Sequence, residues 1–155
     1  MRLIDKIKPT IAAFAATTSL DEDVINMGKC DGCLVIIMLT ISSGTDTGAV
    51  TLLQTTDLAV AGSKAITFTK MWANIVGGDD LTETTVASNT FDIGGVETTP
   101  CMWIIDVPSE ALDADNAFYG MRCNVADITN GEACVLYIPY NLRFSGVNSA
   151  PTLLT

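Results

Sequence analysis

Residues 103–139 read WIIDVPSEALDADNAFYGMRCNVADITNGEACVLYIP, and they predict strands on both sides of a polar connection. The first strand covers the β-branched run 102–107 and ends at Pro108, whose nitrogen cannot donate to a ladder. Residues 109–116 then form a short acidic excursion. This order of apolar strand, breaker and polar loop is typical of an all-β chain.

The second half of the same stretch predicts a hairpin. Residues 119–126 resume an extended pattern, and residues 133–140 form the last strand. Between them stands Asn130-Gly131, a dipeptide that strongly favours a tight hairpin turn. We therefore expect these two strands to be neighbours in one sheet.

Upstream of this stretch, residues 33–41 (CLVIIMLTI) form a continuous apolar run. A run without alternation is typical of a strand that is buried on both faces. After a polar loop at 42–48, residues 49–56 predict the next strand, and we expect the pair to form a hairpin.

Residues 65–72 alternate in polarity. Strand geometry then places Ile66, Phe68, Lys70 and Trp72 on one face of the sheet. The opposite face would carry the intervening threonines and a methionine.

Short strands at 24–27 and 84–93 bring the expected number to about eight. Short strands at this spacing predict an antiparallel β-sandwich or jelly roll. We assign residues 21–140 to this domain, 1–20 to an extended N-terminal arm and 141–155 to a C-terminal tail. A chain of 155 residues suits one such domain.

The composition favours a protein that assembles. Hydrophobic residues make up 48% and charged residues 17%, yet the net charge is −10. Average chains carry roughly 25% charged residues. A protein with this balance hides apolar surface in an assembly and keeps an acidic exterior; a well-packed acidic monomer is the alternative. The eight basic residues are scattered, which disfavours direct nucleic-acid binding.

Two further classes are disfavoured by absences in the sequence. No apolar run approaches the ~20 residues that a membrane-spanning helix needs, so we expect no membrane contact. The apolar run 11–16 is too short for a secretory signal. Histidine is absent, which excludes Ser-His and Cys-His nucleophiles within this chain. We expect no enzyme activity and no cofactor.

Five cysteines raise the question of a zinc site. Cys30 and Cys33 have the CxxC spacing that can place two thiolates on one metal ion. A structural site would need two further ligands from Cys101, Cys123 and Cys134, each of which lies singly in a predicted strand. The pattern favours small buried apolar side chains and reduced thiols, without metal.

Two other groups of residues have a binding alternative. Asp113 and Asp115 could offer oxygens to Ca²⁺, although the EF-hand glycine and distal glutamate are missing; a solvated acidic loop is favoured. Four aromatic residues in strands could form a platform for sugar, with core packing as the favoured interpretation. They are Trp72, Trp103, Tyr137 and Tyr140.

The acidic loop and the strands that follow it carry a resemblance to a known family. About a quarter of the chain resembles small structural proteins of tailed bacteriophages, which act as head decoration or cement proteins. The matching residues are Leu112, Asp113, Asp115, Asn116, Phe118, Arg122, Val125, Ala126, Asp127 and Tyr140. The resemblance implies a jelly-roll type of fold, the major capsid protein as partner, and a homo-oligomer with a trimer ahead of a dimer.

The predicted function is therefore structural. We expect the chain to be made in the host cytoplasm, to bind the outer surface of the phage head and to stabilise the capsid lattice. The alternatives are a carbohydrate-binding β-sandwich module of a tail fibre, or another component of the neck or tail. Apolar residues of the arm and tail are the candidate contacts: Leu3, Ile4, Ile7, Ile11, Phe14, Leu142, Phe144 and Leu153.

Overall fold

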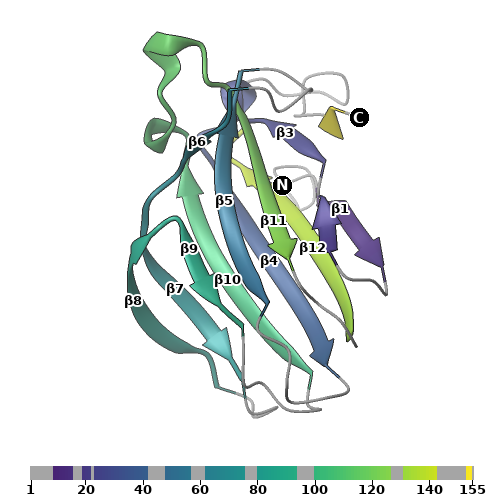
Figure 1. The fold of residues 1–155 in the computed structure, drawn as a ribbon. Coiled ribbons are helices and arrows are strands. Elements are labelled where there is room, and N and C mark those ends of the chain that lie inside the picture. The colour runs from purple at the N-terminus through teal and green to yellow at the C-terminus, as the bar shows by residue number, and fades with distance from the viewer. Residues whose placement is uncertain are drawn as a thin grey trace, which may run out of the picture.

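The computed structural model contains two antiparallel sheets packed face to face as a β-sandwich (Figure 1). The predicted all-β sandwich is thereby confirmed. The structure describes residues 9–15, 19–21, 23–41, 48–56, 62–75, 80–93, 100–126, 131–142 and 153–154. Their helices are three single 3-10 turns, too short to cross a lipid bilayer.

The first layer, which we call the six-stranded sheet, has the order β1-β12-β4-β10-β7-β8. Its central strands β4 and β12 are ten residues long and pair along their whole length. The strands are β1 (Thr10–Ala15), β12 (Gly131–Tyr140), β4 (Gly32–Ile41), β10 (Cys101–Pro108), β7 (Phe68–Asn74) and β8 (Thr82–Ser88).

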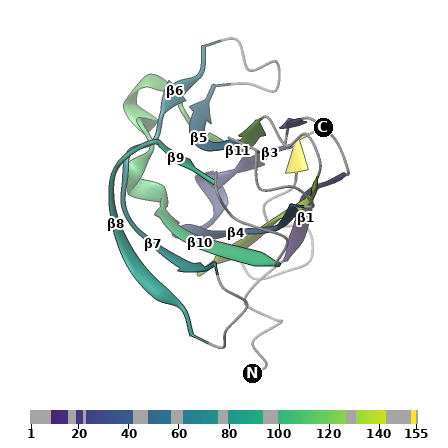
Figure 2. The same cartoon turned by 60° about the horizontal axis from the view of Figure 1, so that its bottom comes forward.

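The second layer, the seven-stranded sheet, lies above the first in the end-on view of Figure 2. It has the order β13-β3-β11-β5-β6, with β2 added on β11 and β9 added on β5. Its strands are β13 (Leu153–Leu154), β3 (Val24–Asn26), β11 (Gly120–Ala126), β5 (Ala49–Thr55), β6 (Lys64–Ala65), β2 (Ser19–Asp21) and β9 (Thr90–Asp92).

Eight of these strands have the nested pairing of a jelly roll. In chain order they are β3, β4, β5, β7, β8, β9, β10 and β11. The first pairs with the last (β3 with β11), the second with the seventh (β4 with β10), the third with the sixth (β5 with β9) and the fourth with the fifth (β7 with β8). Strand β12 then extends the six-stranded sheet beside β4, and β1 lies outside it.

This winding overturns both predicted hairpins. The strands expected at 33–41 and 49–56 are β4 and β5, which lie in opposite sheets. Asn130-Gly131 does not join paired strands either, because β11 and β12 also belong to opposite sheets and Gly131 is already the first residue of β12. In a jelly roll the chain crosses between layers at these points, and local turn signals do not distinguish a crossing from a hairpin.

The core fills the space between the sheets with alternate residues of each strand. Trp103 and Tyr137 are among its largest fully buried side chains. The ring of Phe91 packs against Trp103 at 6.0 Å between centroids. The Cys123 amide of β11 donates to the Tyr137 hydroxyl of β12 over 2.8 Å, so a buried hydrogen bond joins the two layers.

An irregularity in β7 changes the predicted faces of that strand. The pairing register with β8 shifts between Phe68 and Lys70. Phe68 is buried, as are Met71 and Ala73 after the shift, whereas Lys70 and Trp72 face outward. The prediction that Phe68, Lys70 and Trp72 share one face is wrong, because a bulge reverses the alternation.

Parts of the predicted arm and tail belong to the sheets. Within residues 1–20, β1 pairs with β12 and β2 begins its pairing with β11. Within residues 141–155, Leu142 packs against the core and β13 pairs with β3. The boundaries drawn at 20 and 141 are therefore too narrow for the β-domain.

Candidate assembly surface

The outward face of the six-stranded sheet is apolar across five neighbouring strands. Ile36 of β4 lies directly opposite Leu136 of β12 on one side and Ile104 of β10 on the other. The row continues to Ile11 of β1, opposite Leu136, and to Trp72 of β7, opposite Ile104. Directly paired residues share a face of the sheet, so these five side chains form one stripe.

Parallel rows extend the stripe along the strands. One row contains Cys134, Met38 and Met102, which pair across β12, β4 and β10. The other row contains Ile138 and Leu34 and ends at Asp106, the residue of β10 that pairs with Leu34. We call this surface the apolar sheet face, formed by Ile11, Leu34, Ile36, Met38, Trp72, Met102, Ile104, Cys134, Leu136 and Ile138.

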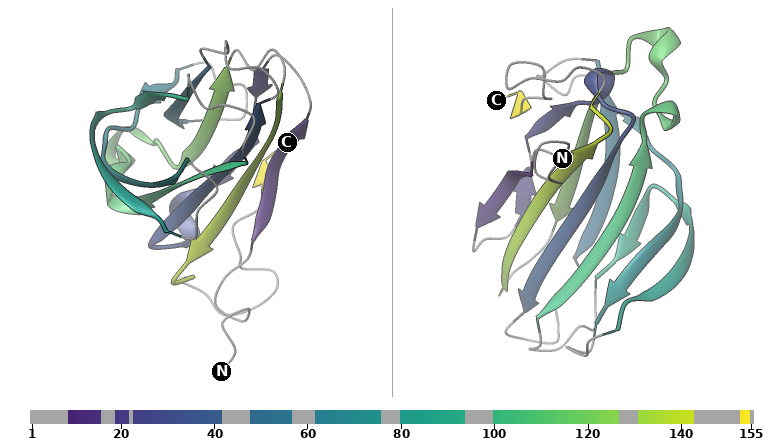
Figure 3. Two further views of the ribbon diagram at one scale, coloured as in Figure 1. Left: turned by 90° about the horizontal axis from the view of Figure 1, so that it is seen from below. Right: turned by 180° about the vertical axis from the view of Figure 1, so that it is seen from behind.

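The apolar sheet face is open to solvent. Ile11 and Met38 expose 59% and 37% of their surface, and the other members are partly exposed. No described strand covers it in the view from behind (Figure 3, right). Strand β4 was predicted to be buried on both faces, but the strands that the structure describes cover only one, and the outer half of its apolar run is partly exposed.

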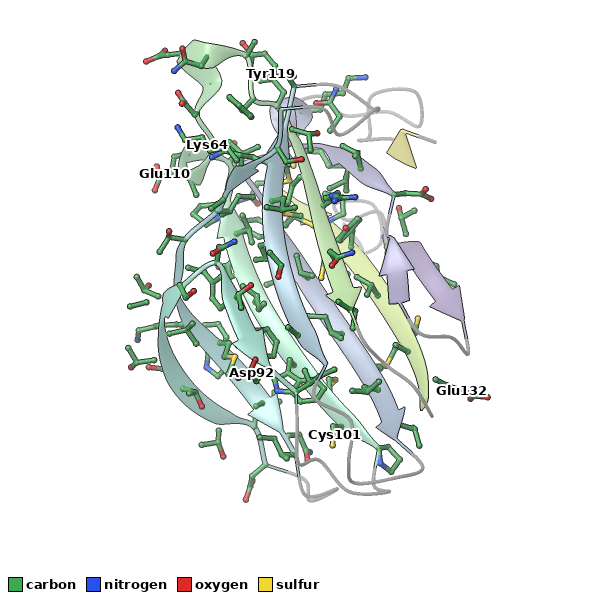
Figure 4. The ribbon with its side chains drawn as sticks, viewed as in Figure 1. Lys64, Asp92, Cys101, Glu110, Tyr119 and Glu132 are labelled. Atoms are coloured by element: carbon green, nitrogen blue, oxygen red, sulfur yellow. The ribbon has the colours of Figure 1, made fainter. Side chains whose placement is uncertain are left out.

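Charges lie only at the margins of the apolar sheet face among the described residues of the sheet. Asp106 follows Ile104 at one end of β10, and Glu132 lies at the opposite end of β12 (Figure 4). On the outer strands, the Lys70 ammonium and the Glu83 carboxylate form an ion pair at 2.7 Å. The centre of the surface is uncharged.

A hollow of about 370 Å³ opens at one end of the apolar sheet face. Met38, Met102 and Cys134 line it together with Pro100, and Glu132 stands at its rim. Methionine side chains are flexible and adapt to different apolar partners. The hollow can therefore take an apolar side chain from another molecule.

The segment 109–119 projects from one end of the sandwich (Figure 1). It contains two 3-10 turns, η3 (Ser109–Ala111) and η4 (Ala114–Asn116). A third, η2 (Met27–Lys29), precedes β4. Glu110 and Tyr119 extend into solvent from the projecting segment (Figure 4), and Tyr119 is 50% exposed.

Asp113 holds the projecting segment to the sandwich. Its carboxylate accepts hydrogen bonds from the Lys64 ammonium at 2.5 Å and the Asn116 amide at 2.9 Å, and its own backbone amide donates to Gln54 Oε1 at 2.7 Å. The hydrogen bonds from Lys64 and then Asn116 lower the pKa of Asp113. These partners occupy both carboxylate oxygens of Asp113, a candidate calcium ligand.

The cysteines lie mostly in the core. Cys30 and Cys33 are buried. Burial raises the pKa of the Cys33 thiol, and the neighbouring Cys30 raises it further by a smaller amount. Cys101 and Cys123 are also buried, whereas Cys134 is partly exposed on the apolar sheet face. The expectation that all five are buried is thus wrong for Cys134. Among the described residues, no three His, Cys, Asp or Glu side chains gather closely enough to hold a metal ion.

The four aromatic candidates divide into two pairs. Trp103 and Tyr137 are in the core, as predicted. Trp72 and Tyr140 face outward and are partly exposed. The Tyr140 hydroxyl donates to Asp106 over 2.8 Å. The pKa of Tyr140 is raised mainly by burial and secondly by this hydrogen bond.

The candidate contact residues of the arm and tail have different positions. Ile11 is exposed within the apolar sheet face, and Leu142 packs on the core. Phe14 of β1 pairs with Cys134 of β12, and Leu153 of β13 pairs with Ile25 of β3. The remaining candidates lie outside the described residues: Leu3, Ile4, Ile7 and Phe144.

Sequence reasoning missed most of the apolar sheet face. The unbroken apolar run of β4 was the signal that could have revealed it, because such a strand needs cover on two sides. No known family model, curated protein or solved structure matches this chain.

Proposed function

We propose that this chain is a structural protein of a tailed-phage head that decorates the outside of the capsid and stabilises it. The observation that carries the proposal is the apolar sheet face, whose centre carries no charge on a chain with a net charge of −10. Exposed apolar patches of this extent mark sites of association. The function is then binding to other virion subunits and not chemistry.

The residues that resemble the phage family support the same proposal through their structural roles. Leu112 and Val125 are buried in the core, and Asp113 fixes the projecting segment. Tyr140 packs over Gly32, its partner across the ladder, where a β-carbon would lie 2.2 Å from the hydroxyl oxygen. The motif residues thus stabilise the core and the ends of the jelly roll. Such roles are expected of residues shared by a family with one fold and one assembly function.

The mechanism is repetition of modest contacts. A shell offers the same binding site many times, so contacts that are weak singly become strong when an oligomer engages several at once. Residues 1–8 carry Leu3, Ile4 and Ile7 and precede β1, which leaves them as candidates for contact with the major capsid protein. The acidic balance disfavours the DNA-facing side of the shell.

Thermal release of DNA from phage particles tests this function. Particles that lack the protein should release DNA at a lower temperature than complete particles, and adding the purified protein back should restore the midpoint. Labelled antibodies should find the protein on the head. Equal release temperatures with and without the protein, or label confined to the tail, would contradict the proposal.

The role of the N-terminal arm is tested by a deletion that is shorter than the predicted arm of residues 1–20. Removing residues 1–20 would also remove β1, so the informative variant lacks residues 1–8. We expect this variant to fold and to occupy fewer sites on the head. The matched control lacks residues 1–20, including β1, and should have a lower free energy of unfolding in solution.

A second candidate function, sugar binding, has its own observation. A hollow of about 260 Å³ is lined by Trp72, Asp106, Lys70 and Thr69. A partly exposed indole beside a carboxylate offers a stacking surface and a hydroxyl acceptor. Binding of host surface polysaccharide measured by titration calorimetry, lost in Trp72→Leu and retained in the control Tyr119→Leu, would favour this role.

A further inference from the structure

We infer that the apolar sheet face is covered by a second copy of this chain, stacked face to face around a twofold axis. The inference rests on the proposed function in one respect, namely that this surface is buried in an assembly. It names the occupant of the surface and predicts a dimer where the family resemblance implied a trimer.

Charge is the first argument for a second copy. Two molecules with a net charge of −10 each repel one another, and like charges brought together at an interface oppose association. The centre of the apolar sheet face, from Ile36 to Ile104 and Met102, carries no charged residue. The centre of this surface can therefore meet the centre of its own copy without juxtaposing acidic groups.

Size is the second argument. Ten-residue strands are ~33 Å long and five strands from β1 to β7 span ~24 Å, so the outward face of the six-stranded sheet measures roughly 800 Å² at most. The three apolar rows, from Leu34 to Met38 on β4, cover less than half of that length. A standard stable interface buries about 800 Å² on each partner. The outward face of the sheet as a whole thus matches the area of a stable dimer interface, with the apolar sheet face as its centre and polar side chains as its rim.

Shape is the third argument. Sheets of the same twist stack face to face with their strands about 30° apart, which is how the two layers of a sandwich meet. Two copies of one sheet have the same twist by definition. The surface also bears projecting Ile11 together with the hollow beside Met38 and Met102, and a surface with both features can be complementary to itself under twofold symmetry.

Sedimentation velocity of the purified protein over a range of concentrations tests the inference. The wild-type chain should pass from monomer to dimer, and the double variant Ile36→Lys, Ile104→Lys should raise the dissociation constant at least about 100-fold because it buries ammonium groups in the interface. The matched control, Leu53→Lys, alters an outward residue of the seven-stranded sheet and should leave the dimer intact. A wild-type chain that stays monomeric, or a folded double variant that dimerises like wild type, overturns the inference.

Alkylation of Cys134 provides a measurement without any substitution. This thiol lies on the apolar sheet face, while the other four cysteines are buried and serve as internal references. The rate of its reaction with N-ethylmaleimide should fall as protein concentration rises, in proportion to the monomer fraction. A rate independent of concentration overturns the inference, even if the lysine variant fails to fold.

These measurements separate the inference from the proposed function, since neither requires capsids. A chain that protects heads against heat but never self-associates would keep its function and lose this interface. A chain that dimerises through this face but leaves particle stability unchanged would keep the interface and lose the function.

Discussion

The outer faces of the two sheets differ although both sheets contribute to one core. On the seven-stranded sheet, Asn124 of β11 lies opposite Thr51 of β5, whose hydroxyl is 2.6 Å from that of Thr90. The next row contains Arg122 and Leu53. This outer face is mainly polar, whereas the equivalent rows of the six-stranded sheet carry isoleucine, leucine and methionine.

The difference shows that one sandwich can combine a polar outer face on one sheet with an apolar outer face on the other. Strand β11 (GMRCNVA) alternates buried and polar residues, as expected for a sheet with one solvated face. Strand β4 (GCLVIIMLTI) does not alternate, although its neighbours in the domain cover only one of its sides. The departure from alternation therefore locates the candidate interface.

The largest effect should come from comparing the two sides of β4. Ile37 is fully buried, so Ile37→Ala should cost about 2–5 kcal/mol of unfolding free energy through lost burial and a cavity. Ile36→Ala, one residue away on the apolar sheet face, should cost about 1 kcal/mol or less. Urea denaturation at concentrations where the chain is monomeric measures both. Equal losses would show that the outer side of β4 is already covered within the monomer.

A smaller effect should appear in the binding of an apolar dye. Monomeric protein should bind anilinonaphthalene sulfonate at the apolar sheet face, and the double variant Ile104→Gln, Leu136→Gln should reduce the fluorescence. Leu53→Gln on the opposite face is the matched control and should leave it unchanged. If the control lowers the signal as much, the two faces do not differ in the way described.

The smallest effect concerns the projecting segment, whose anchor is an exposed ion pair. Hydrogen bonding to Lys64 lowers the pKa of Asp113, so the stabilisation is present above the ordinary carboxyl pKa and is lost as the pH falls through the lowered value. Lys64→Met should lower the thermal midpoint slightly at neutral pH and not in strong acid. Lys70→Met breaks the ion pair with Glu83 and should leave the titration of Asp113, followed by NMR, unchanged. A neutral-pH loss that persists in strong acid would exclude this ion pair as its cause.

Local residue patterns predicted much of the strand content. The strand ending at Pro108, the early strand at 24–27 and the acidic loop after Pro108 all occur near their expected positions. Burial of Trp103 and Tyr137 also followed from their places in apolar strands. These features depend on residues that are close in sequence, so the amino-acid sequence alone is enough to predict them.

The pairing of strands could not be predicted in the same way. Whether the chain turns back after residue 41 or crosses to the other layer depends on which distant strand buries its apolar side. Strand β4 pairs with β10 and β12, about 60 to 100 residues away in sequence, a range at which local turn signals are silent. The candidate site depended on this information, because the apolar sheet face joins five strands from distant parts of the chain.

The sequence by itself determined an all-β chain, rich in apolar residues, poor in charge and without histidine for acid–base chemistry. Only the tertiary structure decided which apolar residues enter the core and which remain outside. The bulge in β7 turned Trp72 outward, and the jelly-roll winding placed Ile36, Ile104 and Leu136 side by side. The physical reason is that a sandwich core covers one side of each sheet, so a strand with apolar residues on both sides leaves the second side partly exposed.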